Sequence, residues 1–205
     1  MVTKQHLTST RYGDPPALHV HAMNDLRFIR ETMERAASFT AVPGWGMVGM
    51  GSTALLTALL ASTRSDPREW LILWIGEALV AIAIGSVTMG RKAQAAQITL
   101  FSGPGWRFLL NLCVPSLAAV PLTAVLCLNG LVGILPGLWL LLYGVGVVTG
   151  GAFAVRVIPL MGFGFILTGI VALFAPPAWG NAFLALGLGG FHLVFGALVA
   201  WRHGG

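Results

Sequence analysis

The chain has 205 residues, of which 56% are hydrophobic and 9% are charged, and its mean hydropathy is +0.82. Soluble globular domains carry about 25% charged residues, so this composition excludes an ordinary soluble domain. The formal net charge of +5 does not indicate nucleic-acid binding. The basic residues lie at the ends of apolar segments, where they set the orientation of a membrane protein.

The first 41 residues are polar and lack the basic start and apolar run of a cleavable signal. We therefore expect residues 1–41 to form a cytoplasmic N-terminal segment and the first apolar span to serve as the insertion signal. Within this segment, "NDLRFIRETMERAASF" predicts an amphipathic helix over about 24–39, with Asn24 as its N-cap.

One face of the predicted helix at 24–39 is apolar, through Leu26, Ile29 and Met33. Three acids and three bases cover the rest, so its net charge is zero, whereas helices that lie on membranes carry an excess of Lys and Arg. We interpret Leu26, Ile29 and Met33 as a protein-interaction face. Its partner is the chain's own bundle, a second copy in a homo-oligomer, or a soluble protein.

Six apolar blocks of roughly 20 residues follow, which is the length that crosses a bilayer. Their approximate ranges are 43–62, 70–90, 107–128, 131–150, 157–175 and 179–201. We predict an all-α membrane protein whose residues 42–205 form one six-helix transmembrane domain. Of the 12 Lys and Arg residues, all but Arg64 and Arg68 fall on one side of this arrangement, so both termini are expected in the cytoplasm.

A weak internal repeat suggests how the spans are grouped. Shifting residues 50–91 by 111 positions gives nine identities, where composition alone predicts about four. The identities include Met50 with Met161, Gly51 with Gly162, and Arg91 with Arg202. We predict three hairpins in parallel orientation, with the first and third the closest relatives.

The stretch "GFGFILTGIVALFAPPAWGNAFLALGLGGFHLVFGALVAW" (162–201) combines small residues, a proline-marked outer turn and a second Gly-rich helix. Together with six short spans, it resembles the HdeD-like family of small bacterial inner-membrane proteins. The resemblance covers the spans and implies a six-helix protein of the bacterial inner membrane. It supplies no catalytic residue. Residues 23–46 lie outside that pattern and look more like the pre-span segment of uncharacterised bacterial integral membrane proteins.

The segment "LILWIGEALVAIAIG" (71–85) is apolar except for Glu77. An acidic residue at a helix centre costs about 2.5–3.5 kcal/mol on insertion scales. We therefore expect Glu77 to have a hydrogen-bond partner, a function or contact with water that offsets this cost. One reading is a neutral acid hydrogen-bonded to His192, Thr57 or a backbone carbonyl. Another is a proton relay or substrate-ion site, and a third is exposure to water.

His192 is the second intramembrane polar candidate. The 111-residue shift matches it with Ala81, one helical turn beyond Glu77 and on the same face. If the first and third hairpins are related by rotation, Glu77 and His192 point to equivalent surfaces, and a hydrogen bond between them is geometrically reasonable.

The sequence contains few residues that could bind a cofactor or a metal ion. A bis-His haem would need two copies, because His192 is the one histidine within a span, and no His/Cys cluster has zinc spacing. Cys113 and Cys127 lie on one predicted helix about 21 Å apart, too far to bridge. We predict no catalytic residue, no metal and no cofactor.

Taken together, these patterns favour a non-enzymatic bacterial inner-membrane protein with a structural, regulatory or accessory role. It sits in the lipid bilayer, with protein contacts through the N-terminal helix and none to nucleic acid. The alternative is a small proton-linked transporter or channel that uses Glu77 and His192. A membrane redox or haem-binding subunit is the second alternative.

Overall fold

The computed structural model describes residues 15–36, 39–97, 99–101 and 103–203, and almost all of them are helical. The chain divides into an N-terminal unit, residues 1–37, and a helical bundle, residues 38–205. The division falls after residue 37 rather than after residue 41, because Phe39 and Ala41 are buried in the bundle.

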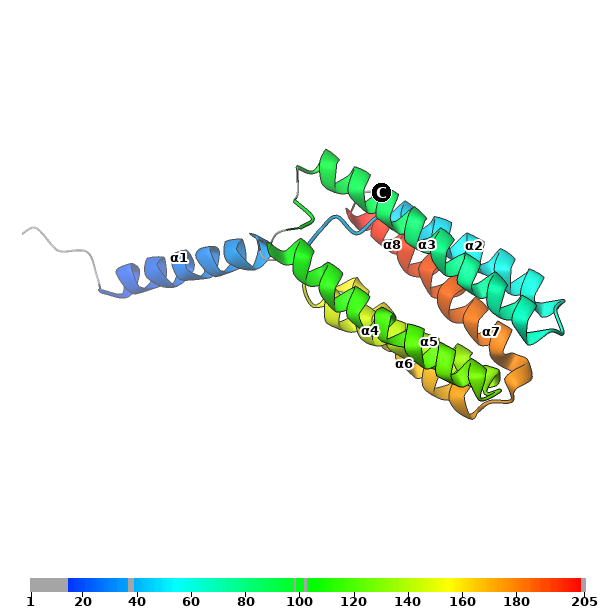
Figure 1. Ribbon diagram of the computed structural model, residues 1–205. Coiled ribbons are helices and arrows are strands. Elements are labelled where there is room, and N and C mark those ends of the chain that lie inside the picture. Colours follow the sequence, from blue (N-terminus) through cyan, green and yellow to red (C-terminus); the bar gives the residue numbers. More distant parts are fainter. Residues whose placement is uncertain (1–14, 37–38, 98, 102, 204–205) are drawn as a thin grey trace, which may run out of the picture. The chain divides into compact units, whose positions relative to one another are not determined.

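The N-terminal unit contains α1 (Pro15–Ala36), drawn in blue in Figure 1. The helix begins at Pro15 rather than at Asn24, since prolines are tolerated in a first turn and no proline or glycine follows Pro16 within the helix. Asn24 therefore lies inside the helix and does not cap it. Leu26, Ile29 and Met33 are exposed on α1, with 62%, 53% and 67% of their surface accessible. Residues 37–38 of the predicted helix lie outside the described ranges, and Phe39, its last predicted residue, lies outside α1 and forms an isolated bridge with Ala154.

The bundle contains six described helical segments long and apolar enough to cross a membrane. They are α2 (Gly44–Ser62), α3 (Pro67–Ala95), α4 (Gly103–Leu128), α5 (Leu135–Gly151), α6 (Val157–Phe174) and a composite sixth span. The sixth joins η2 (Pro177–Trp179), α7 (Gly180–Leu184), the π-helix η3 (Ala185–Phe191) and α8 (His192–His203). A turn of 3₁₀ helix, η1 (Val132–Ile134), precedes α5. The prediction of six apolar spans is confirmed, and the protein is a multi-pass membrane protein.

Local sequence explains where α3 begins and why α4 stays continuous. The Asp66 side chain accepts a hydrogen bond from the backbone N–H of Arg68 at 2.8 Å and so caps α3. Inside α4, Pro115 has no N–H for the carbonyl of Asn111. The hydroxyl of Thr149, on α5, lies 3.3 Å from that carbonyl oxygen and 2.8 Å from the carbonyl of Val145 in its own helix. A neighbouring helix thus places a hydroxyl close to a backbone group that the proline leaves free.

Two helix pairs form the centre of the bundle: α2 with the sixth span, through η3 and α8, and α5 with α6 (Figure 1). Both depend on glycine, because small residues let helix backbones approach closely in a membrane. A Cβ atom on Gly51 would lie 2.7 Å from the carbonyl oxygen of Gly189, and one on Gly144 would lie 2.9 Å from that of Gly162. Gly51 and Gly162, which the 111-residue shift aligns, both occupy such close approaches.

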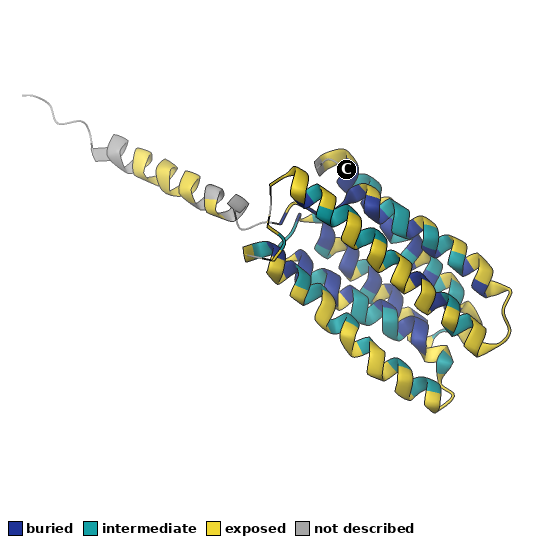
Figure 2. Cartoon of the chain, turned by 45° about the horizontal axis from the view of Figure 1, so that its top comes forward, coloured by how far each residue is buried: buried dark blue, intermediate teal, exposed yellow. Residues whose placement is uncertain are grey.

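The helices α3 and α4 are peripheral. The first packs mainly on α2 and the second mainly on α5, and the rest of their surface is largely exposed, as the yellow segments of Figure 2 show. The sixth span packs more extensively on α2 than on α6, its neighbour in the sequence. The predicted arrangement in three hairpins is therefore not confirmed.

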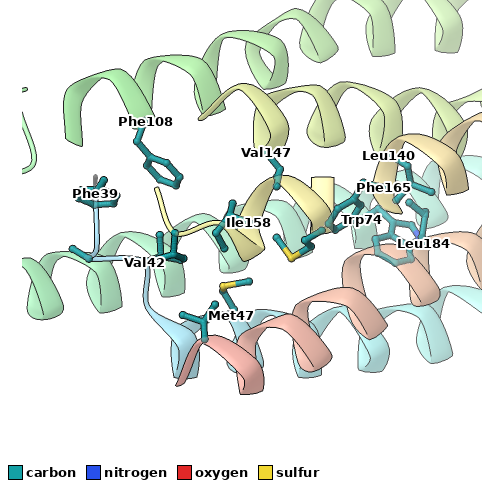
Figure 3. Close-up of a cluster of buried hydrophobic side chains, with 14 of the residues drawn as sticks. Phe39, Val42, Met47, Trp74, Phe108, Leu140, Val147, Ile158, Phe165 and Leu184 are labelled. Atoms are coloured by element: carbon teal, nitrogen blue, oxygen red, sulfur yellow. The ribbon is translucent and has the colours of Figure 1, made fainter. Parts of the chain in front are cut away.

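The core runs along the interior of the bundle (Figure 3). At one end it includes the segment before α2, where the Phe39 ring stacks on Phe108 with centroids 5.0 Å apart. The backbone N–H of Phe39 donates to the carbonyl of Phe153 at 2.6 Å. Lys92 donates to the carbonyl of Val42 at 3.0 Å. The entry to the first span is thus fixed by packing and by hydrogen bonds.

Candidate functional site

The spans contain two buried ionisable side chains among the described residues, and both were sequence candidates. Glu77 is 7% exposed and His192 is 4% exposed. Since burying an unpaired polar group costs free energy, the partners of these two side chains decide what each can do.

Glu77 lies on the buried stripe of α3, one turn beyond Trp74, and faces α2. Its Oε1 is 2.9 Å from the hydroxyl of Thr53, and its Oε2 is 3.2 Å from the hydroxyl of Thr57. The two threonines are four residues apart, so they share one face of α2. The carboxyl group is therefore held by two hydroxyl groups from the neighbouring helix.

This cluster can be fully hydrogen-bonded in either charge state of Glu77. When the carboxylate is ionised, both hydroxyls donate to it. When it is neutral, its O–H can donate to Thr53, whose own proton can go to the carbonyl oxygen of Met50, 2.9 Å away. Thr57 still donates to the other carboxyl oxygen. Gain or loss of one proton thus leaves no polar atom of the cluster without a partner.

His192 begins α8, directly after the π-helix η3. Its Nδ1 is 2.9 Å from the carbonyl oxygen of Leu188, and its Nε2 is 2.8 Å from the hydroxyl of Tyr143 on α5. A carbonyl can only accept, so Nδ1 carries the hydrogen and Nε2 accepts from the tyrosine hydroxyl. Both ring nitrogens of a neutral imidazole are occupied.

Aromatic rings enclose the Tyr143–His192 pair. The Phe165 ring, which is fully buried, meets Tyr143 edge-on at 4.9 Å and His192 at 5.5 Å. The pair therefore joins α5, α6 and α8 at the centre of the bundle. A haem iron could use Nε2 of His192 only after displacing the hydroxyl of Tyr143.

The hypothesis of a hydrogen bond between Glu77 and His192 is wrong: the structure gives the two side chains different partners. The hypothesis assumed that the first and third hairpins are related by rotation, whereas α2 packs against both α3 and α8 and supplies the hydroxyls that reach Glu77. Thr57 had been one of the expected partners. Thr53 could have been found from its four-residue spacing to Thr57, and Tyr143 is one of only two tyrosines in the chain.

A second polar cluster lies near the opposite end of the bundle from Phe39, and sequence patterns did not reveal it. The indole N–H groups of Trp70 and Trp74 both donate to Oδ1 of Asn181, at 2.7 and 3.2 Å. Trp70 also stacks on Trp139, with centroids 5.7 Å apart and planes 10° apart. The indole of Trp139 donates to Thr123 at 2.8 Å. This cluster connects the peripheral helices α3 and α4 to α5 and α7.

An open pocket of about 420 Å³ adjoins this second cluster, with Arg64, Asp66, Trp70 and Asn181 among its lining residues. The charged groups already have partners, since Arg64 pairs with Glu69 at 3.3 Å and Asp66 caps α3.

Among the described residues there is no group of three or more His, Cys, Asp or Glu side chains that could hold a metal ion. Cys113 and Cys127 are free thiols on α4. No family model, curated protein or solved structure matches the chain. The resemblance to the HdeD-like family thus rests on the sequence pattern alone, and the class that the fold defines is a multi-pass helical membrane protein.

Proposed function

We propose that the chain is a non-enzymatic protein of the bacterial inner membrane, with both termini in the cytoplasm and a structural, regulatory or accessory role. One observation carries this proposal: within the described ranges, no buried side-chain nitrogen or oxygen lacks a hydrogen-bond partner. Glu77 and His192 are both held by hydrogen bonds to neighbouring helices, as expected of polar groups that specify packing.

A proton-flux measurement tests this role. The purified protein, reconstituted in vesicles with an internal pH dye, should show no proton flux above that of empty vesicles under a pH gradient or an applied potential. Glu77→Gln, which keeps an amide donor and acceptor in place of the carboxyl group, should behave in the same way. Flux in the wild type that disappears in Glu77→Gln would overturn the structural role.

A proton-linked transporter or channel is the second candidate, and one feature favours it. The Thr53–Thr57–Glu77 cluster keeps its hydrogen bonds with or without the carboxyl proton, which is what a site that takes up and releases a proton requires. In this candidate Glu77 carries the proton. His192 positions α8, because its ring nitrogens are both in use.

For α1 we propose protein binding through Leu26, Ile29 and Met33. Burying each of these exposed side chains could contribute roughly 1.5–3 kcal/mol before the cost of ordering. The acids and bases of this segment balance, so attraction to anionic lipid, about 1 kcal/mol per basic residue, nearly cancels.

Limited proteolysis in native membranes distinguishes the two kinds of contact at α1. Ile29→Asp with Met33→Asp should release the helix and speed cleavage within residues 22–40. Arg27→Gln with Arg35→Gln is the matched control and should leave the cleavage rate unchanged. Release by the arginine changes alone would make α1 a lipid anchor.

A further inference from the structure

The apolar face of α1 follows a heptad spacing. Positions separated alternately by three and four residues run along the helix, which is the spacing of the a and d positions that meet in a coiled coil. The residues at these positions are His19, Ala22, Leu26, Ile29, Met33 and Ala36. The four whose side chains the structure describes, positions 22, 26, 29 and 33, are all exposed. One continuous seam is thus available for a second helix.

The charges beside this seam are complementary to those of an identical helix. With Leu26 at a, the flanking e and g positions hold one acid, Asp25 at g, and one base, Arg30 at e. In a parallel pair each g residue faces the e residue five positions further along the partner, so Asp25 faces Arg30 twice by symmetry. In an antiparallel pair g faces g and e faces e, which would bring like charges together.

We propose that two copies of the chain pair through α1 as a parallel, in-register coiled coil. This rests on the proposed function of α1 as a protein-binding helix and names the protein it binds. Two copies inserted in the same orientation present α1 on the same side of the membrane, which matches the parallel pairing. The seam, over 19–36, is shorter than the three to four heptads typical of a free coiled coil. Anchoring both copies in the same membrane raises the effective concentration of one α1 near the other, which makes up for the short seam.

Disulfide cross-linking of the full-length protein in native membranes tests the register. Cys113→Ala and Cys127→Ala remove the two native thiols, and one cysteine is then introduced into α1. Ile29→Cys, at position d, should give a covalent dimer on mild oxidation. Phe28→Cys, one residue away at the outer position c, is the matched control and should give little. Equal cross-linking at both positions, or none at position 29, overturns the proposal.

A charge exchange tests the pairing of g with e. In the Ile29→Cys background, Asp25→Arg alone and Arg30→Asp alone each place like charges at both contacts, and each should lose most of the dimer. Co-expressing the two variants with different tags should restore a mixed dimer, because the arginine introduced at position 25 of one copy then faces the aspartate introduced at position 30 of the other. Arg27→Asp with Glu31→Arg, at outer positions, should change nothing. Failure of the mixed pair to recover overturns the proposal.

Proteolysis of the same variants separates this proposal from the one it rests on. If α1 stays protected while no cross-link forms, the helix contacts its own bundle or another protein, and only the self-pairing is wrong. If Arg27→Gln with Arg35→Gln releases the helix, both proposals are wrong.

Discussion

Glu77 and His192 show how single polar residues are accommodated inside apolar helices. Each has two hydrogen-bond partners, and in each case at least one partner comes from a different helix. A hydrogen bond contributes about 1 kcal/mol net, but leaving a buried group unsatisfied costs about 1–3 kcal/mol. The partner residues should therefore matter as much as the ionisable residues themselves.

Removing the hydroxyls around Glu77 should destabilise the protein more than changing Glu77. We expect Thr53→Val with Thr57→Val to lower the free energy of unfolding by about 1–3 kcal/mol, because the carboxyl group loses both donors. Glu77→Gln keeps a hydrogen-bonding group in place and should cost less than about 1 kcal/mol. Adding Glu77→Leu to the double-valine variant should recover most of the loss. Denaturant titration of the purified variants measures the free energy of unfolding of each. If the effects of the Thr53, Thr57 and Glu77 changes simply add, the three residues do not interact.

Tyr143→Phe should destabilise the bundle, because Nε2 of the buried His192 loses its donor. The expected cost is again about 1–3 kcal/mol. His192→Leu in the Tyr143→Phe background removes the stranded nitrogen, so this second change should cost less than it does in the wild type. Thermal unfolding followed by circular dichroism gives the comparison. An unchanged unfolding temperature for Tyr143→Phe would contradict the assigned hydrogen bond.

Helix contacts in this bundle depend on where a glycine lies rather than on how many there are. The approaches of α2 to η3 and of α5 to α6 place glycine against backbone, whereas Gly76 on α3 has no atom within 4 Å of a Cβ placed there. Glycine is thus needed for close helix packing at Gly51 but not at Gly76.

Alanine substitution separates these two classes of glycine. Gly51→Ala would place a methyl group against the carbonyl of Gly189 and should cost about 1–3 kcal/mol through overpacking. Gly76→Ala, the matched control, should be neutral or stabilising by about 0.5–1 kcal/mol, because alanine favours the helix. Unfolding temperatures of the two variants measure the difference. Equal effects would mean that α2 and η3 are not in close contact.

At the scale of the whole molecule, an even number of spans predicts that both ends of the bundle lie on the same side of the membrane. The predicted orientation depends on the distribution of Lys and Arg, which leaves only Arg64 and Arg68 on the other side. Arg64 lies in the connection between α2 and α3, and Arg68 lies in the first turn of α3.

Topology reporters test this orientation directly. Fusions at either terminus should read as cytoplasmic, and a reporter inserted next to Ser65 should read as external. An alkaline phosphatase and green fluorescent protein pair gives opposite signals on the two sides and so provides its own control. A cytoplasmic reading next to Ser65 would reverse the orientation.

The six spans could be predicted from the sequence because the apolar length needed to cross a bilayer is a local property of each segment. The same reasoning identified Glu77 and His192, since ionisable residues within apolar segments are rare and costly. Locally, the start of α1 was missed because proline can open a helix as well as end a segment.

The choice of helix neighbours required the tertiary structure. Lipid is as apolar as the helix surfaces, so no hydrophobic force selects one helix pair over another, and close packing and hydrogen bonds decide instead. These contacts depend on atoms far apart in the chain: Thr53 with Glu77, Tyr143 with His192, and Gly51 with Gly189. The sequence alone therefore determined which residues enter the membrane, and the packing of α2 against both α3 and α8 decided which of them meet.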